Sequence, residues 1–392
     1  MKLIRNTLAV ARRETDRITG KRTIYLLTLI APTLLFLVFG YIYSRSLVRE
    51  IPVAVVNNDG GSLSRMITDN IEAASSMKVT RILTSLPEAE HLMKKGEIDG
   101  IFVFPADFEK KIKQGTGSEI SLLINGMNLI KSNYIFNDGL KIIKTFSAGV
   151  LLKKVRSGGF TGDQAMAVIS PVRTDSQILF NPNYSYVNYL VPGLTTFTLM
   201  MLVMLVSVLL ISSEFVHDTF DELLKISERS ALAIVAGKAA PHLLLHLMNI
   251  IILFGVIYPL FGIQINGNAG YTIMFTFFFV MVSLFLGMAI SVWFKDQLQA
   301  TEIALFLTTP AFIFSGLTFP LRAMPELHRG AAMLLPYTHF LDGFVKLSQM
   351  DADLKYVKTD TAALTLFLAF SLFALTTGLI KRMKETERKA QA

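Results

Sequence analysis

Three basic side chains near the middle of the chain have the spacing of one helical face. His242 and His246 lie four residues apart in "HLLLH", and Lys238 precedes them by one helical turn. Two imidazoles at this spacing are able to bind a metal ion, but such a site needs a third ligand and usually a supporting carboxylate. Neither is visible in the surrounding sequence, so we predict no metal site here.

These residues have two other interpretations. The simpler one is that Lys238 extends to the inner membrane interface and that His242 and His246 are buried between helices. The alternative is a polar patch on the path of an anionic substrate. Glu302 has the same two interpretations, because a carboxylate near the inner end of an apolar run is either hydrated or part of such a path.

The sequence lacks residues for cysteine chemistry and a motif for nucleotide binding. The 392 residues include no cysteine, which excludes thiolate nucleophiles, thiolate metal sites and disulfides. No G-x-x-x-x-G-K-S/T motif occurs, and "GMNLIKS" lacks the second glycine before its lysine. We therefore expect the chain to be no enzyme and to hold no cofactor, so that any ATP hydrolysis is performed by a partner.

An acidic stretch, "SSEFVHDTFDELLKISERS" from Ser212 to Ser230, separates two long apolar runs. On a single helix from Ser212 to Ser227, four acids at i, i+4, i+7 and i+8 fall within a stripe about 100° wide. A segregated acidic stripe is repelled by anionic headgroups and suits a basic groove on a partner protein. The alternative is an amphipathic connector whose acids face water. The four acids are Glu214, Asp218, Asp221 and Glu222.

The composition is that of a membrane protein. Of the residues, 52% are hydrophobic and 17% charged, against roughly 25% charged in a soluble domain. The formal net charge of +8 fits an anionic lipid surface better than nucleic acid in so apolar a chain. The apolar run after the basic N-terminus is of full length, so we expect a retained first span and no cleaved signal peptide.

A membrane helix needs about 20 apolar residues, and six segments predict spans. The fifth is short and interrupted by Pro310, and the third is long enough to tilt or break near Pro241. An even number of spans places both termini on one side of the membrane. The predicted spans are Thr23 to Tyr43, Val187 to Ile211, Ala231 to Phe261, Tyr271 to Phe294, Ile303 to Phe319 and Ala362 to Ile380.

Basic residues near the membrane predict the orientation, because short cytoplasmic flanks are enriched in Lys and Arg. The external loop "GIQINGNAG" has none, so both termini are predicted to be cytoplasmic. Residues 1–22 have one apolar side, which predicts an interfacial helix, although an ordinary basic flank is the alternative. Residues 381–392 are predicted to form a cytoplasmic tail. The basic flanks hold Lys2, Arg5, Arg12, Arg13, Arg17, Lys21 and Arg22, then Lys381, Arg382, Lys384, Arg388 and Lys389.

Residues 44–186 predict an extracytoplasmic α/β domain between the first and second spans, because short strand-like runs alternate with helical ones. Strand candidates are "IPVAVVNN", "MKVTRIL", "DGIFVFP", "EISLLIN" and a last one near "DSQILF". Helix candidates are "SLSRMITDNIEAAS", "LPEAEHLMKKG", "ADFEKKIKQG" and 129–156, the first two with serines suited to N-caps. In the second external segment, 320–361, "AAMLLPYTHFLDGF" predicts a re-entrant pair of short helices.

Several motifs, in order along the chain, resemble the membrane subunit of a type-2 ABC exporter of the long-loop branch. That family often has "E…GTxEQLL" after its second span, and here Glu214 is followed by "DTFDELL". Thr219, Leu223 and Leu224 match, Asp221 stands where Glu is usual, and Asp218 where Gly is usual. The exported "IPVAVVNND" and "GEIDGIFVFPADFEKKIKQG" also resemble this branch. The other matching positions are Pro192, Gly193, Pro310, Ser315, Gly316, Pro320, Met324, Pro325 and Pro336.

The resemblance implies a permease that moves a drug, a lipid or another amphiphile out across a bacterial inner membrane. It further implies that 212–230 is a coupling helix seated on a cytoplasmic ATPase, which binds ATP and magnesium. A second copy or a close paralogue, and a periplasmic adaptor protein, are the other expected partners besides lipid.

Two alternatives remain open at this point. A membrane receptor with an exported α/β domain would need no docking helix. An ion-coupled secondary transporter would have charged residues near the middle of its spans and inverted repeats, and neither is evident.

Overall fold

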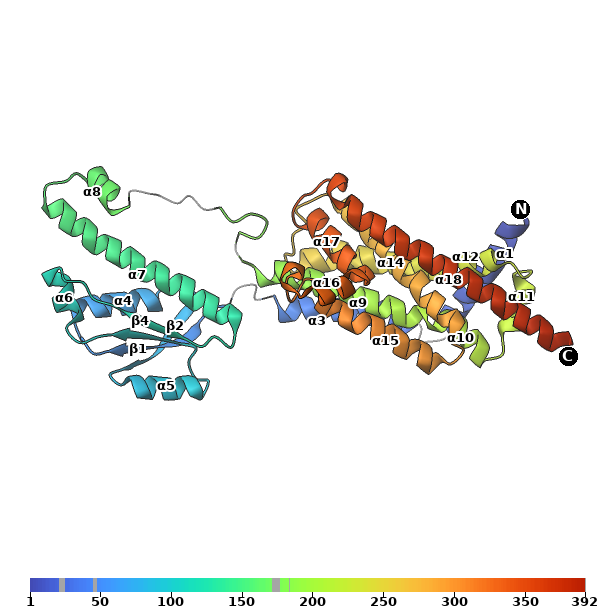
Figure 1. Cartoon of the computed structure of the whole chain (residues 1–392), viewed down its shortest axis with the longest axis horizontal. Helices are drawn as coiled ribbons and strands as arrows, with labels where there is room; N and C mark the ends of the chain where they lie inside the picture. The colour runs from blue at the N-terminus through green and yellow to red at the C-terminus, as the bar shows by residue number, and fades with distance from the viewer. Residues whose placement is uncertain (21–24, 45–47, 171–176, 183, 392) are drawn as a thin grey trace. The chain divides into compact units, whose positions relative to one another are not determined.

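The computed structural model covers the whole chain and describes residues 1–20, 25–44, 48–170, 177–182 and 184–391. The chain divides into two compact units. One unit comprises Met1–Ser46 together with Ile178–Ala392, and the other comprises Leu47–Gln177. Figure 1 shows the first unit as a bundle of helices and the second as a sheet with helices on its faces.

The Leu47–Gln177 unit contains a four-stranded sheet in the order β2-β1-β3-β4. Strand β1 pairs in parallel with β2 and β3, while β4 pairs antiparallel with β3. Val53, Val55 and Ala54 of β1 are all fully buried, as expected for a central strand covered on both faces. Each strand coincides with a predicted one: β1 Ile51–Asn57, β2 Met77–Leu83, β3 Gly100–Phe104 and β4 Ser121–Ile124.

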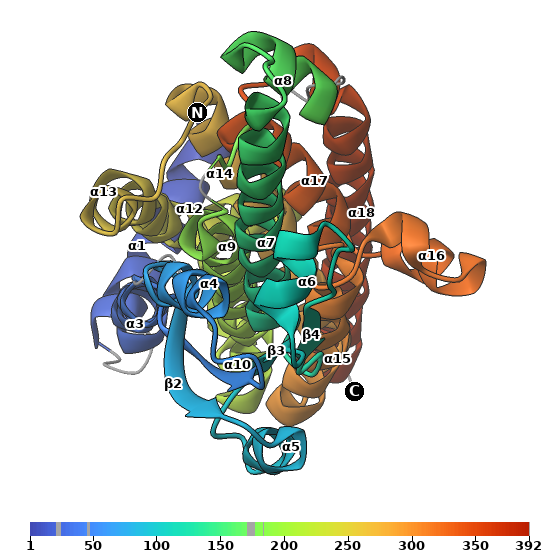
Figure 2. The same cartoon turned by 90° about the vertical axis from the view of Figure 1, so that its left-hand side faces the viewer.

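Helices cover both faces of this sheet. One face packs Val53, Phe102 and Phe104 against α4, α6 and α7, and the other packs Ala54 and Ile101 against α5. Figure 2 gives a second view of this arrangement, with α5 on one side of the strands and α7 on the other. The helices are α4 Ser62–Glu72, α5 Leu86–Lys94, α6 Phe108–Gln114, α7 Leu129–Ser157 and α8 Gly162–Ile169.

Two local predictions for this unit are wrong. The serine N-caps do not form: α4 is preceded by Gly61, and Ser85 at the start of α5 accepts no capping hydrogen bond. For the last predicted strand, residues 175 and 176 lie outside the described residues, and 177–180 form no strand. In the described region the sheet has four strands, and the helices α7 and α8 follow β4.

The helical unit begins with α1 Lys2–Gly20, followed by the π-helix η1 Leu26–Ile30 and α3 Ala31–Ile42. Thr23 and Ile24, where the first predicted span begins, lie outside the described residues, as do residues 21 and 22 of the predicted interfacial segment. The remaining elements are α9 Tyr186–Ser207, α10 Leu209–Val216, α11 Phe220–Ile226, α12 Ala231–Ile252, η2 Leu253–Ile257, α13 Tyr258–Leu260, α14 Ala269–Trp293, α15 Gln297–Phe314, η3 Leu321–Ala323, α16 Glu326–Met333, α17 Pro336–Ser348, η4 Leu354–Val357 and α18 Lys358–Gln391.

Within the described residues, four helical stretches are long and apolar enough to cross a membrane. A shorter apolar helical stretch, Leu26–Ile42, occupies the position of the first predicted span. The fifth predicted span corresponds to α15, which begins at Gln297 and ends at Phe314, before the Gly316 turn at a φ of 91°. The four stretches are Tyr186–Val216, Ala231–Leu260, Ala269–Trp293 and Leu354–Arg388.

Neither proline of the third and fifth predicted spans breaks its helix. Pro241 lies inside α12 and Pro310 inside α15, and both helices continue past them. Apolar helices tolerate an internal proline when neighbouring elements satisfy the freed backbone groups. The irregularity in the third apolar stretch lies further on, in the π-helix η2.

Small residues allow the helices of this unit to approach closely. A Cβ on Gly237 of α12 would lie 2.6 Å from the Cβ of Val10 and 2.8 Å from the carbonyl oxygen of Thr7. A Cβ on Gly287 of α14 would lie 2.5 Å from the Cβ of Ser207. Helix α1 is therefore in direct backbone contact with α12, and α14 with α9.

The remaining family-like positions lie at helix ends and inside α9. Pro192 and Gly193 are within α9, and the Tyr337 hydroxyl donates a hydrogen bond to the Gly193 carbonyl at 2.6 Å. Ser315 ends α15, where its hydroxyl donates to the Phe312 carbonyl at 2.7 Å. The others flank short helices: Pro320 and Met324 bound η3, Pro325 precedes α16, and Pro336 begins α17.

Candidate functional site

The acidic segment is divided between two helices, so the predicted single helix from Ser212 to Ser227 is wrong. Helix α10 ends at Val216 and α11 begins at Phe220. Asp218, between them, has a φ of 52°, in the left-handed region. Only glycine adopts that region freely, although Asp and Asn tolerate it better than other residues. The chain therefore turns at Asp218, and the acids on either side of it do not share one stripe.

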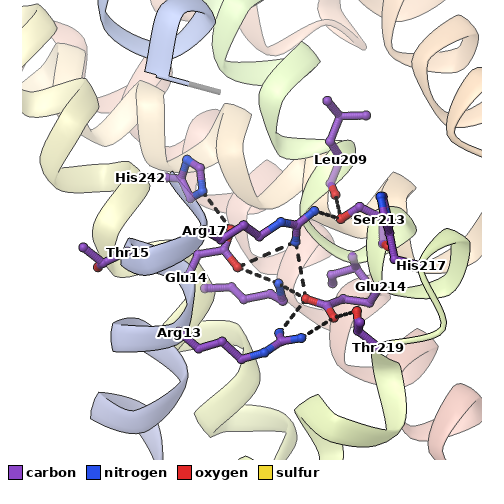
Figure 3. Close-up of polar contacts among 12 residues, drawn as sticks. Arg13, Glu14, Thr15, Arg17, Leu209, Ser213, Glu214, His217, Thr219 and His242 are labelled. Atoms are coloured by element: carbon purple, nitrogen blue, oxygen red, sulfur yellow. Dashed lines mark hydrogen bonds and ion pairs between the residues drawn. The ribbon is translucent and has the colours of Figure 1, made fainter. Parts of the chain in front are cut away.

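Glu214, on the α10 side of the turn, is 1% exposed and is the centre of an ionic cluster. Its Oε1 lies 2.8 Å from Nη1 of Arg13 and 2.6 Å from Nζ of Lys238. Its Oε2 accepts hydrogen bonds from Nη2 of Arg13 at 3.0 Å and from the Thr219 hydroxyl at 2.5 Å. Figure 3 shows Arg13 from α1 and Thr219 from the turn pointing at this carboxylate.

Glu14 is a second buried carboxylate in the same cluster, also 1% exposed. Lys238 bridges the two acids, since its Nζ lies 2.7 Å from Oε2 of Glu14. His242 Nε2 is 3.3 Å from Oε1 of Glu14, as Figure 3 also shows. Arg17 donates to the Ser213 hydroxyl and lies 3.4 Å from Glu214. Two carboxylates and three basic side chains, Arg13, Arg17 and Lys238, thus meet between α1, α10 and α12.

The electrostatics of Glu14 follow from this arrangement. Burial alone would raise the pKa of Glu14, but the Lys238 ammonium and the contact with His242 outweigh burial and hold that pKa well below its usual range. Arg13 is subject to the same competition, and its carboxylate partners Glu214 and Glu222 raise its pKa despite burial. The Glu14 carboxylate and the Arg13 guanidinium are therefore charged in the folded protein at neutral pH.

Sequence reasoning missed the part of α1 in this cluster. The basic N-terminal sequence predicts the orientation of the chain and an interfacial helix, but it predicts no partner for Arg13, Glu14 or Arg17. The available signal was a four-residue periodicity, because Asn6, Val10, Glu14 and Ile18 are the buried residues of α1. A single acid on the otherwise buried face of a basic helix indicates a buried partner of opposite charge.

The predicted coupling residues have two different environments. Glu214, Leu223 and Leu224 are buried, and the two leucines anchor α11 in the main hydrophobic core. Asp218, Asp221 and Glu222 are exposed, and Thr219 is half-buried. Glu222 lies 3.4 Å from Nε of Arg13, whereas Asp218 and Asp221 have no ion pair within the part of the chain that the structure describes. The surface acidity of this segment therefore rests mainly on these two aspartates.

Two further contacts hold the segment that follows α11. On one side, Glu228 pairs with Lys2 and Arg5 of α1, each at 2.8 Å. On the other, Arg229 pairs with Glu387 near the end of α18. Exposed pairs of this kind stabilise little by themselves. They nevertheless place α1 and α18 on either side of the α11 segment.

Of the four residues considered for a substrate path, Lys238, His242 and His246 are buried on α12, and Glu302 lies on α15. Lys238 and His242 are occupied by the two buried carboxylates, as described above. His246 is fully buried, and its Nδ1 lies 3.4 Å from Nδ2 of Asn249, which donates to the Thr28 carbonyl at 2.7 Å. Glu302 is exposed on α15. A search of the described residues for three or more His, Cys, Asp or Glu side chains able to hold a metal ion finds none.

The long apolar helices of the described chain are those of a helical membrane protein, and comparison with known proteins gives its family. Residues 21–380 match the family described as ABC-2 family transporter protein. The chain belongs to this family, because the match covers most of its length.

Several relatives are similar along much of the chain. "Probable multidrug ABC transporter permease YbhR" of Escherichia coli (strain K12) is 25% identical over 336 residues, which cover 84% of this chain and 86% of that protein. "Probable multidrug ABC transporter permease YbhS" of the same strain is 21% identical over 354 residues, 86% of each. "ABC transporter G family member 20" of Dictyostelium discoideum is 23% identical over 392 residues, and this chain spans only 52% of its length.

Proposed function

We propose that this chain is the permease subunit of an ATP-driven exporter that moves a drug, a lipid or another amphiphile outward across a bacterial inner membrane. Energy comes from a separate ABC ATPase, which binds ATP and magnesium and docks on the exposed acids of the α11 segment. The chain itself hydrolyses nothing. Membership in the ABC-2 family and the multidrug permease names of two relatives support the class of this proposal.

The observation that carries the proposal is the buried cluster around Glu214. It joins the end of one apolar helix, α10, to the next, α12, through Lys238, and to α1 through Arg13. A buried ion pair is costly to break because the partner left behind is an uncompensated charge. A force applied by a partner at the α11 segment would therefore move these three helices together, as rigid-body switching requires.

The membrane topology that we propose for the chain is the one predicted from its sequence. It has six spans, including Leu26–Ile42 and α15, with both termini in the cytoplasm and the sheet-containing unit outside. Two copies, or this chain and a close paralogue, would present two α11 segments to two ATPase subunits. The external unit would meet a periplasmic adaptor protein. The long basic helix α1, with Leu3, Ile4 and Leu8 exposed beside its charges, supports a position at the inner lipid surface.

Co-purification tests the docking step. The detergent-solubilised chain is purified with candidate ABC ATPases encoded beside it, and wild type is compared with the variant Asp221→Lys. Asp221 has no ion pair in the described structure and lies outside the left-handed turn, so its replacement leaves the buried cluster intact. We expect the ATPase to bind wild type and to be lost from the variant, because like charges would then face a basic groove.

Asp16→Lys is the matched control, since Asp16 is exposed on α1 and its replacement by lysine changes the charge by the same amount. It is expected to retain the ATPase. If wild type binds no ATPase, docking fails and a receptor with an exported α/β domain becomes the better proposal. Two measurements on the complex in inside-out vesicles then test the direction of transport and the class of cargo. They are the stimulation of ATP hydrolysis by substrate and the uptake of a fluorescent amphiphile.

A further inference from the structure

A groove of about 450 Å³ lies between the α10–α11 turn and the last part of α18. Phe215, Asp218 and Asp221 line it on the turn side, and Arg382 and Glu385 line it on the α18 side. Helix α18 continues to Gln391, well past the end of the predicted last span at Ile380. The groove is thus formed by the acidic turn and by a helical extension of α18 into the predicted cytoplasmic tail.

On the α18 side of the groove, the charged side chains already have partners within the protein. Glu385 pairs with Arg382 at 3.0 Å and with Lys295 at 3.4 Å. Arg382 also donates from Nε to the Val292 carbonyl at 3.0 Å and from Nη2 to the Trp293 carbonyl at 2.6 Å. These contacts fix the α18 wall to the end of α14. Neither Arg382 nor Glu385 is available to a ligand without breaking them.

The turn side of the groove has unbalanced negative charge. Asp218 and Asp221 are exposed and, among the residues described, neither forms an ion pair. Phe215 forms an apolar surface beside them, and the guanidinium of Arg382 already lies over its ring, 5.6 Å from the centroid. An anionic headgroup or phosphate would be repelled by the two free carboxylates. A long cationic side chain fits both features, because its stem packs on apolar surface while its charge meets the acids.

We propose that this groove receives one arginine or lysine side chain of the ATPase subunit, and that the extension of α18 is the second wall of the docking site. This inference rests on the proposed function, and it adds α18 to a contact otherwise assigned to the α11 segment alone. The partner side chain is held between Asp218 and Asp221, beside Thr386, which also lines the groove.

Filling the groove without changing its charge tests the inference. Thr386→Trp places a bulky side chain in the groove, and Lys384→Trp is the control on an exposed position of the same helix that does not line the groove. We expect Thr386→Trp to weaken ATPase binding about tenfold, comparable with Asp221→Lys, because both prevent the cation from reaching the acids. The control should change binding less than twofold. Thermal unfolding of the purified variants verifies that both are folded.

The chain has no cysteine, so single cysteines allow a second measurement in the native background. Thr386→Cys, labelled with a benzophenone maleimide, is expected to cross-link to the co-expressed ATPase on illumination, and Lys384→Cys to do so weakly. Suppose that Asp221→Lys abolishes binding, while Thr386→Trp binds the ATPase normally and the labelled Thr386→Cys variant forms no cross-link. The groove is then excluded as the binding site, and docking on α11 stands. If wild type binds no ATPase, the proposed function and this inference both fail.

Discussion

Glu214 and Asp221 lie seven residues apart in the same acidic segment, yet their environments are opposite. Glu214 is 1% exposed and contacts Arg13, Arg17, Lys238 and Thr219. Asp221 is exposed and has no ion pair in the described chain. The left-handed turn at Asp218 separates the two. One end of the segment is therefore bound into the helical unit, and the other is free to meet a partner.

Acids in one short segment thus have two distinct environments, with different expected effects of replacement. The buried acid links helices, and its removal should reduce stability. The charges of the exposed acids contribute little to the fold, so neutralising them without disturbing the backbone should affect only binding. Stability measurements on the free permease and binding measurements with the ATPase therefore separate the two sets. The following substitutions test this division, beginning with the largest expected effect.

Replacing Lys238 by methionine should destabilise the protein most. Glu14 and Glu214 would both keep their negative charge in a buried site with their shared cation removed. Breaking a buried ion pair in this way costs about 3 to 5 kcal/mol. The free energy of unfolding, measured by titration with SDS in mixed micelles, should fall by that amount. Lys225→Met removes an exposed lysine from α11 and is expected to change stability by less than about 0.5 kcal/mol.

Replacing Glu14 by glutamine should have a smaller effect that depends on pH. Charge-assisted hydrogen bonds contribute about 1.5 to 3 kcal/mol, so the variant should lose this much at neutral pH. Because the pKa of Glu14 is lowered on folding, its stabilisation is complete above the unfolded value, about 4.3. It is lost as the pH falls from there through the lower folded pKa. The difference between wild type and variant should therefore shrink in acid. A constant difference from pH 7 to pH 3 would contradict the assignment.

Replacing Gly237 by leucine should separate α1 from α12. Its Cβ alone would lie 2.6 Å from the Cβ of Val10, closer than side chains approach in proteins. Overpacking of this kind costs about 1 to 3 kcal/mol, and displacement of α1 would also weaken the pairing of Arg13 with Glu214. Gly255→Ala is the control, because no atom lies within 4 Å of the Cβ position there. Cysteine accessibility at position 10 should rise in the leucine variant only, and equal accessibility in both would refute the close contact.

The sheet-containing unit was the part of the fold most accessible to sequence reasoning. Its four strands are short apolar runs bounded by turn residues, and local pattern alone defines them. The helical unit was harder, because apolar composition marks a span without fixing its ends. Polar residues such as Gln297 and Glu302 conceal the first turns of α15, which begins six residues before the predicted span at Ile303. The continuation of α12 through Pro241 depends on neighbouring helices, which a single sequence does not reveal.

The candidate site was only half predictable for a related reason. The projection of Glu214 and Asp221 onto one stripe assumed an unbroken helix, and the backbone conformation of Asp218 invalidates it. Arg13 lies 201 residues from its partner Glu214 in sequence, and Glu14, which shares Lys238 with Glu214, is similarly distant, so no local pattern could connect them. The sequence shows an acidic segment and its charge, whereas the division between buried and exposed acids required the tertiary contacts.

Asp218 itself provides the last and smallest test. Its φ of 52° explains why a glycine is usual at this position in the family it resembles, since glycine adopts the left-handed region without steric cost. Asp218→Gly should keep the free energy of unfolding within about 0.5 kcal/mol of wild type, whereas Asp218→Val should lower it by about 1 to 2 kcal/mol. Both variants lose the same charge, so any difference between them reports the backbone alone. If valine were tolerated as well as glycine, α10 and α11 would not be separated by a left-handed residue, and the proposed division between buried and exposed acids would lose its structural basis.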